Sequence, residues 1–455
     1  MNSIPNDILS KIFQDCFQNQ RTEKFGCACP SLNEAPLLLL RVCQRWHVCA
    51  LSTPSLWSQL SVGRGKNGLL SVIAAKVWLD RAGLLPLSLD LRYDKGDPTQ
   101  ERAIDAAMVN IFTPSRIWKA VFLEVYRPVP DPRVDAILDA VLTHAPVLES
   151  FALLVTGYAD RGILSGIMPT RTIKFGLNPC LASISVYIKH LEHRFRLSFT
   201  NIHTYGNIRD LTLHYPESIS HCLQILDRCP NVEVLRISLH GEVRPSRTTF
   251  LMLKQLHRLE VTATVTEGTD FGDFFRALCT PALIQLSIQK YESWGHPRPR
   301  NWPSLAQLLE RCQPPLKSFT LVGPCMNDND IISCLQHTQQ LTVLSGDELL
   351  LSSKVMDALT PNVDRQNVLL CPLLAKIGIH GRRPIFLPVA AMIYERWKRS
   401  KQKCISDAVN LQIPMVEAVE MPSEYCSRFL SCLGMTECVE NGMELQLTSS
   451  ASIYL

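Results

Sequence analysis

A short apolar pattern of the form L-x-x-L-x-L recurs along this chain from about residue 85 onward, and it constrains the fold more than any other feature. Copies occur at Leu148-Phe151-Leu153, Leu181-Ile184-Val186, Ile208-Leu211-Leu213, Val232-Leu235-Ile237, Leu256-Leu259-Val261, Leu283-Leu286-Ile288, Leu316-Phe319-Leu321 and Leu374-Ile377-Ile379. Between the central residues of neighbouring copies, from Phe151 to Phe319, the gaps are 33, 27, 24, 24, 27 and 33 residues. Periods of this length indicate a solenoid, in which each repeat buries its apolar face against the next.

Segments with helical spacing separate many of the predicted strands, at Val134 to His144, Ile219 to Arg228, Phe271 to Leu278, Leu305 to Arg311 and Ile331 to His337. This order of strand, turn, helix and turn resembles the leucine-rich repeat. The resemblance implies an irregular α/β solenoid with a parallel sheet over residues 85–385, whereas the alternative is an ordinary α/β domain. The asparagine that the family places after each strand is replaced by Pro216, His240, Thr264, Tyr291, Pro324 and Arg382, so we expect repeats of unequal length.

The start of the chain has the pattern of a proline-led amphipathic helix followed by shorter apolar helices. Pro5 suits a first helical turn, and Ile8, Leu9, Ile12, Phe13, Cys16 and Phe17 recur at the spacing of one apolar stripe. After a polar segment, Asn19 to Glu34, the run from Leu37 to Cys43 is almost wholly apolar and is expected to be buried on most sides. A third short helix is predicted from Arg45 to Leu51, before Pro54-Ser55-Leu56-Trp57.

The order and spacing of these segments resemble an F-box over residues 1–62. The resemblance implies that the helices bind a Skp-type adaptor, and through it a cullin, in an SCF-type E3 ubiquitin ligase. The positions that match the family's adaptor-facing residues are Ile4, Pro5, Ile8, Leu9, Val42, Cys43 and Trp46. Trp46 and Trp57 could equally be core residues. The polar insert is longer than in a compact F-box, and Ile4 and Asp7 stand where the family more often has Leu and Glu.

Residues between the apolar positions of each repeat point outward on the sheet, because successive side chains of a strand alternate between its faces. They form three rows: Asp210, Val234, Arg258, Gln285 and Ser318; Thr212, Arg236, Glu260, Ser287 and Thr320; and His214, Ser238, Thr262, Gln289 and Val322. The candidates for binding a protein substrate are Asp210, Thr212, His214, Arg236, Arg258, Glu260 and Gln285. The alternative is a solvated sheet face with no ligand.

Cysteine is followed closely by proline just before four of the strands, at Cys229, Cys279, Cys312 and Cys371. Proline ends the preceding helix, and cysteine is expected to fill its last buried position. Cys426, Cys432 and Cys438 lie six residues apart without a C-x-x-C pair, so no metal site is predicted. With 17 cysteines scattered over 455 residues and no secretory signal, reduced thiols are expected.

Other functional classes find little support in the sequence. Lys and Arg number 46 against 42 Asp and Glu, without a basic stripe, so a nucleic-acid partner is not expected. No apolar run approaches the roughly 18 residues of a membrane helix. The segment Gly63 to Gly68 fits G-x-G-x-x-G, but the preceding predicted strand, Leu56 to Val62, interleaves polar residues, so a flexible turn is preferred to a dinucleotide site. No catalytic motif or cofactor is predicted, and His190 and His193 lie on a charged segment.

The sequence therefore predicts a non-catalytic substrate receptor of an SCF-type ligase, cytoplasmic, nuclear or both. Its predicted parts are an F-box-like domain at 1–62, a connection at 63–84, the repeats at 85–385, and a capping helix with a poorly patterned tail at 386–455. The basic run from Arg396 to Lys403 suits the end of that helix and is also a weak candidate nuclear signal. The alternative function is a repeat scaffold that joins no ligase. The substrate is not predicted.

Overall fold

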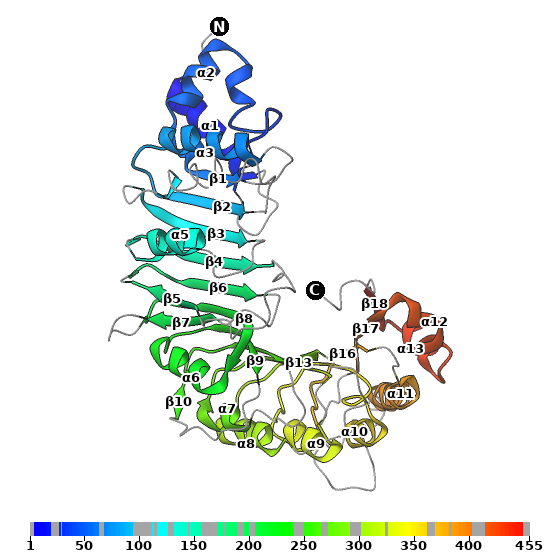
Figure 1. Ribbon diagram of the computed structural model, residues 1–455. Coiled ribbons are helices and arrows are strands. Elements are labelled where there is room, and N and C mark those ends of the chain that lie inside the picture. Colours follow the sequence, from blue (N-terminus) through cyan, green and yellow to red (C-terminus); the bar gives the residue numbers. More distant parts are fainter. Residues whose placement is uncertain are drawn as a thin grey trace, which may run out of the picture. The chain divides into compact units, whose positions relative to one another are not determined.

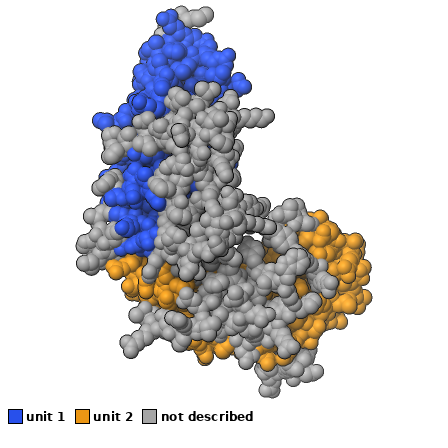
Figure 2. Space-filling model, viewed as in Figure 1, with its two compact units in different colours: residues 1–215 blue, residues 216–455 orange. Residues whose placement is uncertain are grey.

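The protein consists of two compact units, Met1–Tyr215 and Pro216–Leu455, which are coloured separately in Figure 2. The computed structural model (Figure 1) describes residues 4–19, 27–28, 30–62, 68–93, 111–112, 116–125, 132–143, 145–156, 171–176, 178–188, 195–199, 205–240, 250–264, 272–291, 302–323, 326–361, 369–381, 385–402 and 415–448. No helix within these ranges is long and apolar enough to cross a membrane.

The first unit begins with a group of helices, here called the helical module: α1 (Asn6–Asn19), η1 (Leu39–Arg41), α2 (Gln44–Leu51), η2 (Pro54–Trp57) and α3 (Gly68–Arg81). Pro5 precedes α1, and the Cys43 sulfur accepts the Trp46 N–H at 3.5 Å to cap α2. Trp57 is fully buried, and its indole N–H donates to the Ala50 carbonyl at 2.9 Å. The buried indole is thus hydrogen-bonded as well as packed.

Parallel strands follow the helical module and lie in the sheet in chain order. They are β1 (Gln59–Val62), β2 (Leu87–Tyr93), β3 (Trp118–Val125), β4 (Ser150–Val155), β6 (Ser183–Ile188) and β8 (Asp210–Ser218), in which the boundary between the units falls. α5 (Pro132–Leu142) connects β3 to β4, and β5 (Arg171–Phe175) pairs with β7 (Phe195–Phe199) in a separate small sheet.

The second unit continues the alternation of helix and strand. Its larger sheet is parallel, in the order β9 (Val234–His240), β11 (Arg258–Thr264), β13 (Gln285–Tyr291), β14 (Ser318–Val322), β15 (Val343–Gly346), β16 (Lys376–Ile379), β17 (Ala418–Pro422) and β18 (Glu444–Thr448). A small sheet pairs β10 (Leu251–Met252) with β12 (Leu278–Cys279). The helices are α6 (Ile219–Arg228), α7 (Gly272–Ala277), α8 (Pro303–Cys312), α9 (Asp328–Gln336), α10 (Ser353–Leu359), α11 (Phe386–Gln402), η4 (Ser423–Tyr425), α12 (Cys426–Leu430) and α13 (Met435–Glu440). Helices α8 to α11 lie along one side of this sheet (Figure 1).

The predicted α/β class with a parallel sheet is confirmed, and the apolar pattern supplies its core. Every apolar residue of the predicted copies, from Leu148 to Ile379, is at most 2% exposed. The central residues are also in register: Leu235 pairs with Leu259, Leu259 with Leu286 and Leu286 with Phe319. The predicted helices correspond to α5, α6, α7, α8 and α9, and their bounds differ from the observed ones by at most three residues.

Several local predictions are wrong. The run from Leu37 to Cys43 is not buried on most sides: Leu38, Val42 and Cys43 are exposed, because the segment forms only the short 3-10 helix η1, in which Leu39 is the buried residue. The predicted strand from Leu56 is η2 at its start, and the sheet begins at Gln59. Of the four cysteines predicted to fill buried positions, Cys229 and Cys371 are buried, whereas Cys279 and Cys312 are half-buried.

The C-terminal region is more ordered than its pattern predicted. Residues 415–448 supply β17 and β18 to the sheet, and α12 and α13 pack against α11. Phe429 of α12 is fully buried, with its ring centroid 6.1 Å from that of Phe386 on α11. Arg396, the first residue of the basic run predicted at the end of this helix, is 0% exposed. Residues 63–67, His190, His193 and Lys403 lie outside the described residues.

Candidate binding surfaces

Helix α1 carries two apolar stripes, one buried and one exposed. Leu9 and Phe13 are 4% and 1% exposed and pack into the helical module. Ile4, Ile8 and Ile12 are 49%, 42% and 40% exposed. Residues four apart lie one above another on a helix, so Ile8 and Ile12 share one face, and Ile4 lies just before the helix at the same spacing. A helix that served only the module's own core would need just one of these stripes.

Two valines on the neighbouring short elements are also exposed. Val42 follows η1 and is 52% exposed, and Val48 on α2 is 58% exposed. Exposed apolar side chains are normal singly, whereas several on one small module are typical of a protein-binding surface. We call Ile4, Ile8, Ile12, Val42 and Val48 the exposed apolar set.

Polar contacts hold the start of the chain against α2. The Arg45 guanidinium donates to Asn6 Oδ1 at 3.2 Å from Nε and 3.1 Å from Nη2, and also to the Ile4 carbonyl. Further along α1, the Ser10 and Thr53 hydroxyls are 2.9 Å apart. Ile4 is therefore held in place by backbone and side-chain contacts rather than extending freely from the helix.

The structure places the predicted adaptor-facing residues in three environments. Ile4, Pro5, Ile8, Val42 and Cys43 are exposed. Trp46 is half-buried, with its ring edge-on to Phe13 at 5.0 Å between centroids. Leu9 lies in the core of the helical module. Ile12 and Val48 were not predicted. Ile12 could have been found from its spacing of four residues from Ile8. It was missed because the prediction placed Ile8, Leu9, Ile12 and Phe13 on a single apolar stripe.

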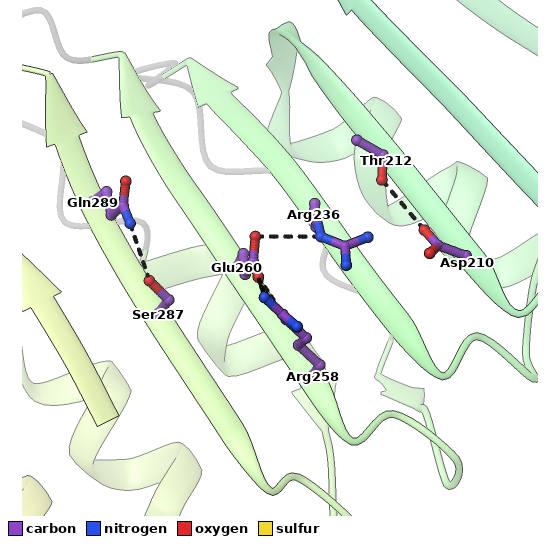
Figure 3. A network of polar contacts seen from close by, with 7 residues as sticks. All are labelled: Asp210, Thr212, Arg236, Arg258, Glu260, Ser287 and Gln289. Atoms are coloured by element: carbon purple, nitrogen blue, oxygen red, sulfur yellow. Dashed lines mark hydrogen bonds and ion pairs between the residues drawn. The ribbon is translucent and has the colours of Figure 1, made fainter. Parts of the chain in front are cut away.

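A second surface lies on the sheet of the second unit, where the predicted outward rows are in register. Arg258 pairs with Val234 and Gln285, and Glu260 pairs with Arg236 and Ser287. The side chains of Arg236, Arg258 and Glu260 meet on this face (Figure 3). Arg258 donates from Nε and Nη2 to Glu260 Oε1 at 2.6 and 2.5 Å, and Arg236 Nε lies 3.4 Å from Glu260 Oε2. The Glu260 carboxylate thus orients both guanidinium groups, and the three side chains together carry a formal net charge of about +1.

The remaining predicted substrate residues have local contacts. The prediction that Thr212, Ser238 and Thr262 are outward and accessible is wrong, because these short side chains are buried between their larger neighbours. In the first unit, the Thr212 hydroxyl donates to Asp210 Oδ1 at 3.3 Å, and the His214 ring centroid lies 5.5 Å from that of Tyr187 on β6. Gln285 is exposed on β13. In Figure 3, Gln289 is joined to Ser287 by a hydrogen bond of 3.5 Å.

A charged cluster on later strands was missed by the sequence analysis. Lys376 on β16 lies 2.6 Å from Glu420 Oε2 on β17 and donates to Gln446 Oε1 on β18, also at 2.6 Å. Burial lowers the pKa of the nearby His380, and the charge of Glu420 opposes that shift. The cluster was missed because β17 and β18 were assigned to a tail. The spacing of Val416, Val419 and Met421, which repeats L-x-x-L-x-L, could have revealed β17.

Neither a protein-family model nor a curated protein matches this chain. Within the part of the chain that the structure describes, no three or more His, Cys, Asp or Glu side chains gather closely enough to hold a metal ion. The candidate sites considered below are the exposed apolar set of the helical module and the network of Arg236, Arg258 and Glu260 on the sheet of the second unit.

Proposed function

We propose that this chain is the substrate receptor of an SCF-type E3 ubiquitin ligase. In this proposal the helical module is an F-box that binds a Skp-type adaptor and through it a cullin. The strand and helix repeats form a leucine-rich-repeat solenoid that binds a protein substrate. The receptor itself would perform no chemistry, because it contributes by holding the substrate close to the ubiquitin-loaded enzyme of the complex.

The exposed isoleucine stripe on α1 is the observation that carries the proposal. Folding has already buried Leu9 and Phe13, so the helix does not need Ile4, Ile8 and Ile12 for the module's own core. Removing apolar surface from water is favourable by roughly 25 cal/mol for each Å². A partner that covered this stripe would therefore gain binding free energy from it. The stripe includes Ile4 and Ile8, two of the positions at which the F-box resemblance implies adaptor contact.

The substrate-binding part of the proposal rests on the Arg236, Arg258 and Glu260 network. The side chains of Arg236, Arg258 and Glu260 are 25%, 43% and 27% exposed, so solvent screens their ion pairs. Screened pairs typically contribute 0 to about 1 kcal/mol to stability, which is too little to explain the network by folding energy. Because Glu260 orients both arginines, a ligand carboxylate would meet guanidinium groups that have already lost much of their conformational freedom.

Co-purification with the adaptor tests the first part. The wild-type chain should retain a Skp-type adaptor, and combining Pro5→Ala with Ile8→Asp should abolish retention, because a carboxylate would be buried at the interface. Leu84→Asp is the matched control: Leu84 is 86% exposed and lies outside the apolar set, so retention should be unchanged. If the wild type retains no adaptor, or the double variant retains it fully, the chain is instead the non-catalytic repeat scaffold.

Affinity capture in cells treated with a proteasome inhibitor tests the second part. Combining Arg236→Glu with Arg258→Glu should remove captured substrate while adaptor retention stays at the wild-type level. Arg276→Glu, an exposed arginine on α7 paired with Asp273, is the control for added negative charge. Loss of adaptor and substrate together would indicate misfolding, and unchanged capture would exclude this face as the substrate site.

A further inference from the structure

Two cysteine thiols face each other in the second unit. The sulfur atoms of Cys279 and Cys312 are 3.6 Å apart, and both residues are half-buried. Cys279 is the last residue of β12 and Cys312 the last residue of α8. The sulfurs would need to approach to about 2.05 Å to form a disulfide, a movement that side-chain rotation with a small backbone shift can supply.

The neighbouring residues hold the two sulfurs together. Arg311, next to Cys312, donates to the Leu278 carbonyl at 2.5 Å and to the Phe275 carbonyl at 3.3 Å. The Thr280 N–H, next to Cys279, points to the Cys312 sulfur at 3.4 Å. Each cysteine is therefore tied, through its chain neighbour, to the segment that carries the other. This tethering raises the effective concentration of one thiol at the other.

Two other repeats also have a cysteine just before the proline that precedes the strand, but these cysteines are more deeply buried. Cys229 and Cys371, which also come just before a proline, are fully buried, and burial raises the pKa of their thiols to about 12 and about 11. A thiol must ionise to attack a disulfide, and an oxidant must reach it. Burial also raises the pKa of the Cys279 thiol, so the difference lies in access. Cys279 and Cys312 are half-buried and can be reached by a small oxidant, whereas Cys229 and Cys371 are fully buried.

We propose that Cys279 and Cys312 are an oxidative modification site, at which a low-molecular-weight disulfide such as glutathione disulfide produces an intrachain cross-link. In the first step the thiolate of one cysteine attacks glutathione disulfide, forming a mixed disulfide and releasing one glutathione. In the second step the other thiolate attacks the protein sulfur of that mixed disulfide and releases the second glutathione. Two protein thiols lose two electrons and two protons, and one glutathione disulfide becomes two glutathione molecules.

The cross-link would join two consecutive repeats on the helical side of the sheet. It closes a loop between residues 33 apart in sequence, so it should stabilise the folded chain by restricting the unfolded one. The site does not depend on ligase assembly or on the sheet-face surface.

Incubating the reduced full-length chain with millimolar glutathione disulfide tests the proposal. A non-reducing peptide map should link Cys279 to Cys312, and the linked peptides should together weigh two hydrogens less than the two reduced peptides. The exposed Cys16, Cys43 and Cys180 should instead carry separate glutathione adducts. The cross-linked chain should melt several degrees higher than the reduced chain. Cys312→Ser should leave a stable glutathione adduct on Cys279, since no second thiol remains to displace it.

Two further variants separate this site from general thiol reactivity. Cys426→Ser with Cys432→Ser removes two other half-buried cysteines and should leave the cross-link unchanged. Arg311→Met removes the tether and should slow the second step several-fold, giving more mixed disulfide. The proposal is overturned if the wild type ends with unmodified thiols, with separate glutathione adducts on both residues, or with either cysteine linked elsewhere. The wild-type peptide map decides this even if a variant fails to fold.

Discussion

Arg396 is a fully buried guanidinium on α11 that is held by backbone carbonyls. It donates to Leu359 O at 3.1 and 2.9 Å, to Leu370 O at 2.9 Å and to Cys371 O at 3.2 Å. Leu359 ends α10, where unpaired carbonyls and the helix dipole favour a cation. Burial lowers the pKa of Arg396 to about 10, which still leaves it charged at neutral pH. This residue joins three segments of the chain rather than presenting a basic signal.

We predict that Arg396→Lys destabilises the second unit by about 2–4 kcal/mol. Lysine keeps the charge, but its single ammonium group cannot reach three separated carbonyls as the planar fork does, so buried acceptors lose their donors. Urea unfolding measures the effect. Arg399→Lys, at a half-buried position of the same helix, is the control and should change the free energy of unfolding by less than about 0.5 kcal/mol. Equal effects of the two substitutions would contradict the structural role of Arg396.

At the scale of single elements, α1 shows how one helix can serve both a core and a surface. Phe13 packs edge-on to Trp46 inside the helical module, and the adjacent residue Ile12 faces solvent. The apolar pattern indicated a helix but did not separate these two roles. Periodicity counts apolar positions, whereas the neighbouring elements decide which of them are covered.

The two roles predict opposite responses to truncation of adjacent residues. Phe13→Ala should lower the free energy of unfolding of the first unit by about 3–5 kcal/mol, since it leaves a cavity in the core. Ile12→Ala should change it by less than about 1 kcal/mol and should instead weaken adaptor retention. Thermal unfolding followed by circular dichroism, combined with the co-purification assay, distinguishes them. Loss of stability in Ile12→Ala would place that side chain in the core instead.

At the scale of the whole molecule, regular repetition continues beyond the range in which the sequence pattern is clear. The repeat that contains β15 has Leu341 and Leu344 at the first two positions of the apolar pattern and Gly346 at the third. A Cβ atom at Gly346 would lie 2.7 Å from the Leu321 carbonyl oxygen. Glycine is required there for close approach of the chain, so the third apolar residue of the pattern is missing. β17 and β18 extend the same sheet, and Val419 pairs with Ile377 and Leu445.

Ending the chain after residue 414 should therefore damage the second unit. It would expose the edge of β16 and the face of α11 that Phe429 covers, so we expect a lower melting temperature and self-association. Size-exclusion chromatography and thermal unfolding measure both effects. A chain ending after residue 448, which keeps β18, is the control and should behave as the full-length protein does. A monomeric, equally stable chain ending at 414 would show that these strands are dispensable.

The sequence by itself determined the α/β class, the parallel sheet and the burial of the apolar residues that recur in the L-x-x-L-x-L pattern. Leu235, Leu259 and Leu286 recur at the spacing of stacked repeats, and they pair with one another on adjacent parallel strands. The local pattern was therefore sufficient to predict that these side chains are buried. The tertiary structure decided which apolar residues stay exposed on α1, where Arg396 finds its carbonyls, and which two cysteines meet. Those outcomes depend on contacts between residues far apart in sequence, such as Arg396 with Leu359 and Cys279 with Cys312. No local periodicity encodes such contacts, because they are set by how separate elements pack against one another.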